Sequence, residues 1–232
     1  MNLDLAKHKN ILLQILKDIY TDITIGPILG FKGGTAVYLF YNLSRFSVDL
    51  DFDLLDSTKS EYVYTRLVTI LQKYGTVKRN YQKRYTLFLL GSYAEKSQNI
   101  KVEVNLRDFG SRYEIKDYLG IAMKVMLQED MFANKLVAIW ERLGKTNRDI
   151  FDVWFFLKNN WPINQPIITK RTNLPLTKFL QKCITSLESM SNRNILTGIG
   201  ELLDPQQKPW IKANLITDTI LLLKIRLSAE QA

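Results

Sequence analysis

The sequence is poor in the two side chains that most often carry nucleophilic and transition-metal chemistry. Its 232 residues include one histidine, His8, and one cysteine, Cys183. A single cysteine excludes an intrachain disulfide framework and the paired cysteine ligands of structural zinc sites. A single histidine excludes multi-histidine metal sites. Because His8 falls in an expected N-terminal helix, we predict no Ser–His or Cys–His relay, and any general base is expected to be a carboxylate.

The sequence also lacks long apolar runs. No segment approaches the ~20 consecutive apolar residues of a membrane span. The N-terminus has neither the apolar region nor the small-residue cleavage site of a signal peptide. We therefore expect a protein of the cytoplasm without a membrane partner, a compartment that suits a single thiol. The 46% hydrophobic content is sufficient for a core, and the length allows one large or two small domains.

What is present is a mixed pattern of strands and helices, followed by helices. We expect helices over 3–20, 59–74, 127–143 and 148–158, a short irregular strand over 25–31, and strands over 47–55, 76–90 and 99–107. Pro162, Pro166 and Pro175 mark a looser connection before further helical segments. The pattern predicts an α/β unit over 1–120 and a helical unit over 121–232, with the boundary between 115 and 127.

A glycine turn follows the 25–31 strand. Gly33 and Gly34 precede Thr35 and an apolar helical segment. Glycines let a phosphate approach the backbone, and a helix N-terminus offers unpaired N–H groups. The spacing is neither that of a P-loop nor GxGxxG. A double glycine before a helix is usually an ordinary turn, so this motif alone is weak evidence for nucleotide binding.

The 47–55 strand carries an acidic face. Asp49, Asp51 and Asp53 alternate with apolar residues, which places neighbouring carboxylates ~6–7 Å apart along one face. Strands disfavour Asp, so the pattern indicates either a solvent-facing edge or a Mg²⁺ site. Glu103 alternates in the same way in the 99–107 strand. It is either an ordinary surface residue or, if the two strands are neighbours, the third carboxylate of a metal site for phosphoryl transfer.

Basic charge is concentrated in one stretch. Residues 73–101 hold seven basic side chains and one acidic, or +6 of the net +9: Lys73, Lys78, Arg79, Lys83, Arg84, Lys96 and Lys101 against Glu95. Tyrosine and phenylalanine are interleaved with them. Cations with aromatic rings are typical of RNA binding, through phosphate contacts and base stacking. A solvated hairpin face whose tyrosines cover the sheet is the alternative.

The order of these motifs resembles that of the polymerase-β-like nucleotidyltransferase superfamily: two glycines, a helix, Asp-x-Asp on a strand and a carboxylate on a later strand. The string from Lys32 to Phe52 is similar to its AbiEii/AbiGii toxin branch, which belongs to toxin–antitoxin and abortive-infection systems. The segment ED…ANKLVAIWER…RDIFDVWFFL is similar to the same family, so the resemblance covers about 25–160. It implies an α+β fold, in which a small mixed sheet with flanking helices is joined to a C-terminal helical domain that completes the nucleotide cleft.

The resemblance also implies residue roles. Asp49, Asp51 and Glu103 would be catalytic metal ligands, with Glu103 also accepting the proton of the attacking hydroxyl. Lys135 and Asp152 would be further catalytic residues, although a salt-bridge network between two helices explains them equally well. Nucleotide binding would fall to Lys32, Gly33, Gly34, Thr35, Arg45, Ser47 and Asp149. Lys32 and Arg45 equally fit charge compensation for the aspartates, Ser47 equally fits a backbone contact, and we predict no direct role for Asp53.

The implied activity is that of a toxin. It would use Mg²⁺, or Mn²⁺, to transfer a nucleoside monophosphate (NMP) from a nucleoside triphosphate (NTP) to an acceptor hydroxyl and release pyrophosphate. RNA is the favoured acceptor, with a tRNA 3′ end first, since added nucleotides there would block translation. Lys78, Arg79, Lys83 and Arg84 are the candidate RNA contacts. A protein or small-molecule acceptor and a non-catalytic nucleotide- or RNA-binding module are the alternatives, and a toxin implies a cognate antitoxin protein encoded nearby.

Overall fold

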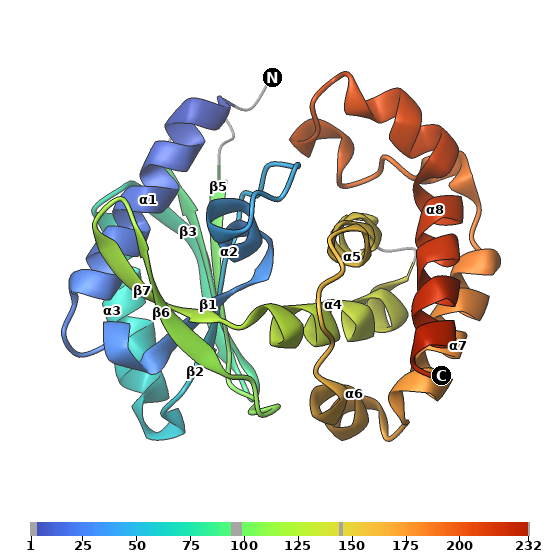
Figure 1. The fold of residues 1–232 in the computed structure, drawn as a ribbon. Coiled ribbons are helices and arrows are strands. Elements are labelled where there is room, and N and C mark those ends of the chain that lie inside the picture. The colour runs from blue at the N-terminus through green and yellow to red at the C-terminus, as the bar shows by residue number, and fades with distance from the viewer. Residues whose placement is uncertain (1–3, 94–98, 144–145, 232) are drawn as a thin grey trace. The chain divides into compact units, whose positions relative to one another are not determined.

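The computed structural model of the chain describes residues 4–93, 99–143 and 146–231. Leu3, Glu95 and Lys96, which contribute to the predictions above, lie outside the described residues. The chain forms two compact units, Met1–Asp108 with Arg112–Met126 and Phe109–Ser111 with Leu127–Ala232 (Figure 1). The division expected between 120 and 121 falls in the turn between the last two strands, both of which belong to the first unit.

The first unit is a seven-stranded mixed sheet with helices. Its elements are α1 (Leu5–Thr21), η1 (Gly26–Ile28), β1 (Leu29–Lys32), α2 (Gly33–Phe40), β2 (Leu50–Leu54), η2 (Ser57–Lys59), α3 (Ser60–Gln72), β3 (Thr76–Lys83), β4 (Thr86–Ser92), β5 (Asn99–Asn105), β6 (Tyr113–Tyr118) and β7 (Ile121–Met126). The strand order is β3-β4-β5-β2-β1-β7-β6. Strands β2 and β5 are parallel neighbours, and β1 pairs antiparallel with β2 and parallel with β7.

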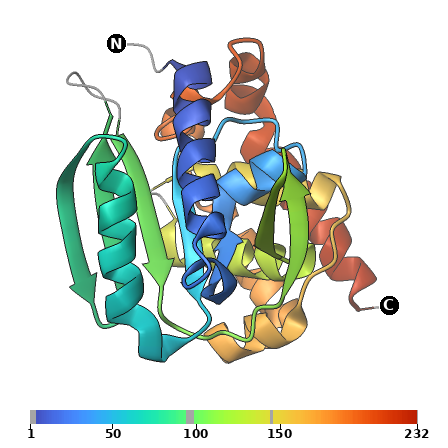
Figure 2. The same ribbon diagram turned by 90° about the vertical axis from the view of Figure 1, so that its left-hand side faces the viewer.

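The two faces of this sheet differ in chemistry. Helices α1 and α3 cover one face (Figure 2), and the apolar side chains of the central strands pack beneath them. On that face Phe31 of β1 is the register partner of Phe52 of β2, with their ring centroids 5.4 Å apart. Because strand side chains alternate between faces, the intervening polar residues of β1, β2 and β5 all project from the opposite face. That opposite face carries the acidic side chains.

The second unit is helical. It contains α4 (Gln128–Arg142), α5 (Arg148–Lys158), α6 (Gln165–Thr172), α7 (Leu176–Glu188), η3 (Asn192–Asn194), η4 (Gly200–Leu202) and α8 (Gln207–Ala229). Its core includes the fully buried rings of Phe132, Phe156 and Phe179. Within the described ranges, no helix is long and apolar enough to cross a membrane.

Most of the predicted elements are confirmed, and with them the α+β class. The strand expected over 76–90 is instead a hairpin, because Arg84 and Tyr85 form a turn between β3 and β4. The β6–β7 hairpin was not predicted. Its turn contains Leu119, whose φ of 53° is unusual for a residue other than glycine, followed by Gly120 at φ 79°.

The two rare side chains are both buried and structural. His8 Nε2 donates to the carbonyl of Val48 at 3.0 Å, so Nδ1 accepts from the Tyr93 hydroxyl at 2.7 Å. Burial lowers the pKa of His8 below its ordinary value, which keeps the ring neutral. Burial also raises the pKa of the Cys183 thiol to about 12, so it is a poor nucleophile.

Candidate active site

Three carboxylates predicted to form a cluster lie together on the face of the sheet opposite α1 and α3. Asp49 immediately precedes β2, and Asp51 lies within it. Strand β5 runs parallel to β2 with Asp51 as the register partner of Glu103. Register partners on neighbouring strands share a face and lie ~4.8 Å apart. The condition set by the sequence analysis, that Glu103 lies beside the aspartate strand, is therefore met.

A cation lies at the centre of this acidic cluster, which we define as Asp49, Asp51 and Glu103. The ammonium of Lys101, two residues before Glu103 on β5, lies 3.6 Å from Asp49 Oδ2, 3.6 Å from Asp51 Oδ1 and 3.2 Å from Glu103 Oε2. Burial alone would lower the pKa of Lys101, but the three carboxylates raise it above its ordinary value. Lys101 therefore pairs with the acidic cluster, although in the sequence it falls in the basic stretch 73–101.

The acidic cluster has the donor chemistry of a Mg²⁺ site. Oxygen ligands from two or three carboxylates suit Mg²⁺ and Mn²⁺, and the convergence of all three groups on one ammonium shows that they can share a positive charge. As the side chains stand in the described ranges, no group of three or more His, Cys, Asp or Glu residues has the geometry to hold a metal ion. The carboxylates are arranged around an ammonium at salt-bridge distances, so metal binding requires Lys101 to withdraw.

The glycine turn packs directly against the acidic cluster. Gly33 begins α2 with φ +75°, and a Cβ there would lie 2.5 Å from Asp51 Oδ2. A Cβ on Gly34 would lie 2.8 Å from both Arg45 Nη2 and Ser47 Oγ. Side chains at these positions would displace the groups that surround the N-terminus of α2. Both glycines are thus required by close approach, and the helix N-terminus lies beside Asp51.

Three predicted nucleotide-binding residues are buried behind that turn. Thr35, Arg45 and Ser47 are each less than 5% exposed. The Thr35 hydroxyl lies 3.0 Å from Ser47 Oγ and also contacts the backbone carbonyl of Asp49. Arg45 Nη1 donates to the carbonyl of Phe46 at 2.9 Å. In this arrangement the three side chains tie α2 to the segment that leads into β2, and so help to place Asp49.

Asp53 has a definite role that the sequence analysis did not predict. Its side chain accepts from Lys32 Nζ at 2.5 Å, Asn105 Nδ2 at 2.7 Å and the Tyr113 hydroxyl at 2.6 Å. These partners come from β1, β5 and β6. Asp53 is 7% exposed and the Lys32 side chain 23% exposed. Asp53 therefore fixes Lys32, the residue before the glycine turn, while the lysine keeps partial access to solvent.

The helical unit holds a second group of predicted residues. Lys135 of α4 places Nζ 2.8 Å from Asp149 Oδ1 and 2.8 Å from Asp152 Oδ2, both on α5. Arg142 pairs with the other oxygen of Asp149 at 3.0 Å. The Asp152 side chain is fully buried and the Lys135 side chain is 16% exposed. The predicted salt-bridge network between the two helices is thus present, and only Lys135 of the central trio retains appreciable exposure.

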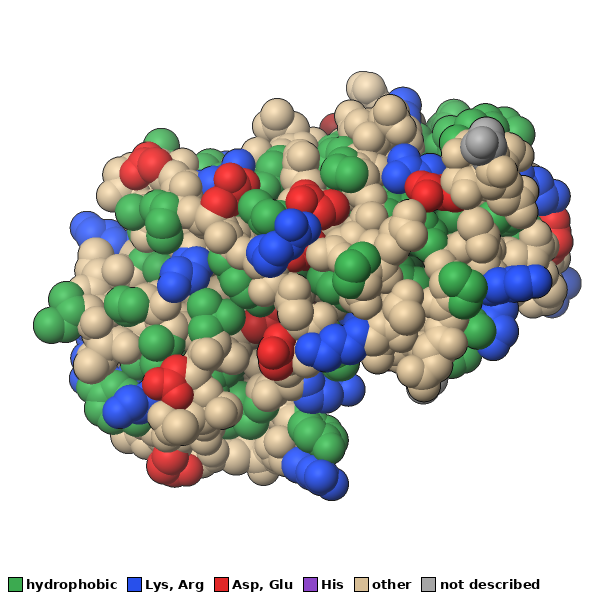
Figure 3. Space-filling view, turned by 60° about the horizontal axis from the view of Figure 1, so that its bottom comes forward, with side chains coloured by type: hydrophobic (Ala, Val, Ile, Leu, Met, Phe, Trp, Pro, Cys, Tyr) green, Lys and Arg blue, Asp and Glu red, His purple; other side chains and the backbone are tan. Residues whose placement is uncertain are grey.

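The predicted RNA contacts lie on the β3–β4 hairpin at the edge of the sheet. Arg79 and Lys83 flank Tyr81 along β3, Lys78 lies at a β-bulge, and Arg84 occupies the turn. Arg84 Cζ lies 5.0 Å from the centroid of the Tyr85 ring. On the face seen in Figure 3, basic and acidic side chains are interspersed. The net charge of +9 therefore does not by itself identify an RNA-binding surface. Whether the hairpin can bind RNA depends on the residues of the hairpin.

Comparison with known proteins decides the family. Residues 14–173 match the family described as nucleotidyl transferase AbiEii toxin, type IV toxin–antitoxin system. The chain belongs to the AbiEii nucleotidyl transferase toxin family. This confirms the resemblance seen in the glycine turn, the Asp-x-Asp strand and the α4–α5 block, and the chain is accordingly a nucleotidyltransferase. Membership in a type IV system also implies an antitoxin partner.

Solved structures share the fold of this AbiEii-family protein. An H. pylori protein assigned as a nucleotidyltransferase is 19% identical, with a TM-score of 0.62 over 99% of this chain and 97% of its own. JHP933 from Helicobacter pylori is 20% identical, with a TM-score of 0.56 over 100% of this chain and 97% of its own. A search of curated proteins found no match. At these identities the likeness concerns the fold.

Proposed function

We propose that this AbiEii-family toxin transfers an NMP from an NTP to the 3′ hydroxyl of an RNA, using Mg²⁺, with Mn²⁺ as the alternative. The observation that carries the proposal is the convergence of Asp49, Asp51 and Glu103 on one cation in register-paired strands. Beside them, the N-terminus of α2 offers backbone N–H groups that suit a triphosphate. Together these features supply a cation site and an anion site at adjoining positions.

We propose the following residue roles. Asp49, Asp51 and Glu103 would hold the metal, which when bound stabilises phosphate charge and lowers the pKa of the acceptor hydroxyl. Lys32 and the backbone of Gly33 and Gly34 would bind the triphosphate. The acceptor oxygen forms a bond to the α-phosphorus, the bond from that phosphorus to the β-phosphate oxygen breaks, and pyrophosphate leaves. Glu103 is the proposed acceptor of the hydroxyl proton.

Other predicted residues are proposed to act indirectly. Thr35, Arg45 and Ser47 are buried, so they would support the glycine turn and Asp49. In the helical unit, Lys135 is the proposed phosphate contact because its side chain is 16% exposed, whereas those of its partners Asp149 and Asp152 are 4% and 0% exposed. Asp149, predicted to bind the nucleotide, and Asp152, predicted to be catalytic, would position that ammonium.

A tRNA 3′ end is our first candidate for the acceptor. Nucleotides added there would block aminoacylation and stop translation, which would account for toxicity. The cognate antitoxin would be a protein encoded nearby that prevents this reaction. Hydroxyls of a protein or of a small molecule are the competing acceptors for the same chemistry.

The location of transferred label tests the acceptor class. We expect ³²P from one α-labelled NTP, supplied with Mg²⁺ and total RNA, to enter RNA of tRNA size. Periodate oxidation of the RNA destroys its 3′ diol, so the oxidised sample should take up no label while the untreated sample serves as its control. Label in a protein band or a small molecule, with none in RNA, would overturn the RNA acceptor and leave the nucleotidyltransferase assignment in place.

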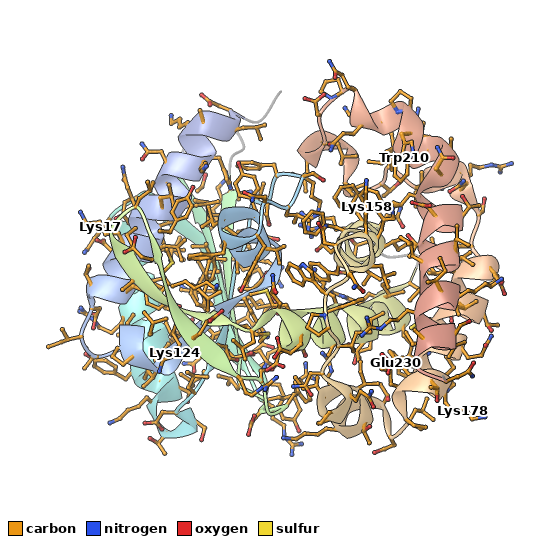
Figure 4. All side chains as sticks on the ribbon, in the orientation of Figure 1. Lys17, Lys124, Lys158, Lys178, Trp210 and Glu230 are labelled. Carbon is orange, nitrogen blue, oxygen red and sulfur yellow. The ribbon has the colours of Figure 1, made fainter. Side chains whose placement is uncertain are left out.

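Lys101→Met is expected to strengthen metal binding. The substitution removes the ammonium that competes for the three carboxylates. At about 0.2–1 kcal/mol for each of the three ion pairs, the competition is on the order of 1.4 kcal/mol, or about tenfold in affinity. The Kd for Mn²⁺, measured by electron paramagnetic resonance or calorimetry, should therefore fall about tenfold or more. Lys17→Met on the outer side of α1 (Figure 4) is the matched control and should change nothing. An unchanged Kd in Lys101→Met would show that the ammonium does not compete with the metal.

A further inference from the structure

The sheet register connects the acidic cluster to the basic hairpin. From β3 inward, Tyr81 is the register partner of Phe88, Phe88 of Glu103, Glu103 of Asp51, and Asp51 of Lys32. These five residues form one row across the sheet and, because register partners share a face, all project from the face opposite α1 and α3. A straight path of side chains thus runs from the edge strand to the acidic cluster.

The outer end of this row is an aromatic and cationic platform, which we define as Arg79, Tyr81, Lys83 and Phe88. The Tyr81 and Phe88 rings are stacked, with centroids 4.7 Å apart and an angle of 8° between their planes. Arg79 Cζ lies 5.3 Å and Lys83 Nζ 4.9 Å from the centroid of the Tyr81 ring. Alternation along β3 places Arg79 and Lys83 on the same face as Tyr81. The platform combines two half-buried rings with two positive charges.

The position of the platform fits a strand that enters from the rim of the sheet. β3 is an edge strand, and its residues are exposed or half-buried. Neighbouring strands lie ~4.8 Å apart, so Phe88 is about 10 Å and Tyr81 about 14 Å from Asp51 across the sheet. That span is short enough for a few nucleotides at one 3′ end to reach both the platform and the acidic cluster.

We propose that the platform binds the unpaired bases that immediately precede the reacting 3′ hydroxyl of an RNA acceptor. This rests on the nucleotidyl transfer proposed above and names how its acceptor is held. Bases stack on aromatic side chains without sequence preference, and Arg and Lys bind the phosphates between them. A base inside a duplex cannot present its face to Tyr81 and Phe88. The platform therefore selects single-stranded 3′ ends, and a duplex without an overhang is a poor acceptor.

Binding of RNA without NTP tests the platform separately from catalysis. Fluorescence anisotropy would compare a hairpin RNA carrying a four-nucleotide 3′ overhang with the same hairpin ending blunt. Stacking is worth ~1–3 kcal/mol per base, so we expect Tyr81→Leu with Phe88→Leu to weaken binding of the overhang about tenfold or more. The same variant should leave the weaker binding of the blunt hairpin unchanged. Arg79→Gln with Lys83→Gln should reduce the slope of log K against log salt by about 1.4, or 0.7 for each lost phosphate contact.

The controls distinguish loss of the platform from misfolding of the sheet and from failure of the proposed function. Lys7→Gln with Lys17→Gln removes two exposed charges from α1, on the opposite face of the sheet, and should preserve the salt slope. Equal overhang binding by wild type and Tyr81→Leu with Phe88→Leu, or an unchanged slope in Arg79→Gln with Lys83→Gln, would overturn the platform. In that case the basic residues would serve only to keep an edge strand from pairing. Wild-type transfer of NMP into RNA would still stand, since it is measured in a separate reaction.

Discussion

The double variant Asp49→Asn with Asp51→Asn is expected to abolish both NMP transfer and growth inhibition. Each substitution keeps the side-chain shape but removes a negative charge from the acidic cluster. The proposed metal contributes several kcal/mol of transition-state stabilisation, and 1.36 kcal/mol corresponds to tenfold in rate. Transfer should therefore fall by about 10³-fold or more, as measured by incorporation of label from an α-³²P NTP.

Loss of fold would not explain this result. The two aspartates repel each other, and Lys101 keeps its contact with Glu103 at 3.2 Å in the double variant, so the unfolding temperature should stay close to that of wild type. Asp117→Asn is the matched control, since Asp117 is exposed at the far edge of the sheet and its side chain accepts from the Gly120 N–H, a bond that Asn can also make. If the double variant were as toxic as wild type, the acidic cluster would not be the cause of the toxicity.

The second large effect concerns stability. Lys135→Met removes the ammonium that pairs with Asp149 and with the fully buried Asp152. Removing one partner of a buried ion pair costs about 3–5 kcal/mol, so the free energy of unfolding should fall by that amount. Urea denaturation followed by circular dichroism would measure it.

Two comparisons isolate the buried charge as the cause. Lys178→Met removes an exposed lysine of α7 (Figure 4) and should change the free energy of unfolding by less than about 0.5 kcal/mol. Lys135→Met combined with Asp152→Asn removes both charges and should recover part of the loss. A decrease below about 1 kcal/mol in Lys135→Met alone would mean that the network contributes little to folding, and that Lys135 is retained for another purpose.

The parts of the site predicted from sequence are those encoded by local pattern. Period-two alternation is enough to place Asp49, Asp51 and Asp53 on one face of a strand, and to give Glu103 a polar face of its own. Two glycines before an apolar run identify the start of α2. Each of these patterns depends on the geometry of a single segment, so it can be recognised without knowing which strands or helices lie beside that segment.

What the sequence could not provide is set by strand order and register. Lys101 belongs to a basic stretch in the sequence, yet β5 places it beside β2, where its ammonium meets three carboxylates. The sequence predicted no direct role for Asp53 because its partners Lys32, Asn105 and Tyr113 come from three other strands. The β6–β7 hairpin was missed because Leu119 adopts a left-handed backbone that sequence signals for turns do not anticipate.

Strand order and register also decide which cations of the basic stretch lie near the acidic cluster, and the sequence alone does not give them. Among residues 73–101, Lys73 pairs with Asp18 of α1 at 3.0 Å, and Lys101 joins the acidic cluster. The remaining described cations lie on the β3–β4 hairpin, and only Arg79 and Lys83 have a register that puts them on the face of Asp51 and Glu103. Charge counting finds the stretch, whereas the sheet decides which of its members are near the proposed chemistry.

The most direct measurement of the central claim is the fate of the two ends of the NTP. Wild-type protein would be incubated with Mg²⁺, total RNA and an NTP labelled with ³²P either at the α- or at the γ-phosphate. Nucleotidyl transfer at the acidic cluster predicts α-label covalently bound to RNA and γ-label released as pyrophosphate, with both signals lost in Asp49→Asn with Asp51→Asn. Transfer of γ-label to the acceptor, or α-label incorporation that persists in that double variant, would contradict the account.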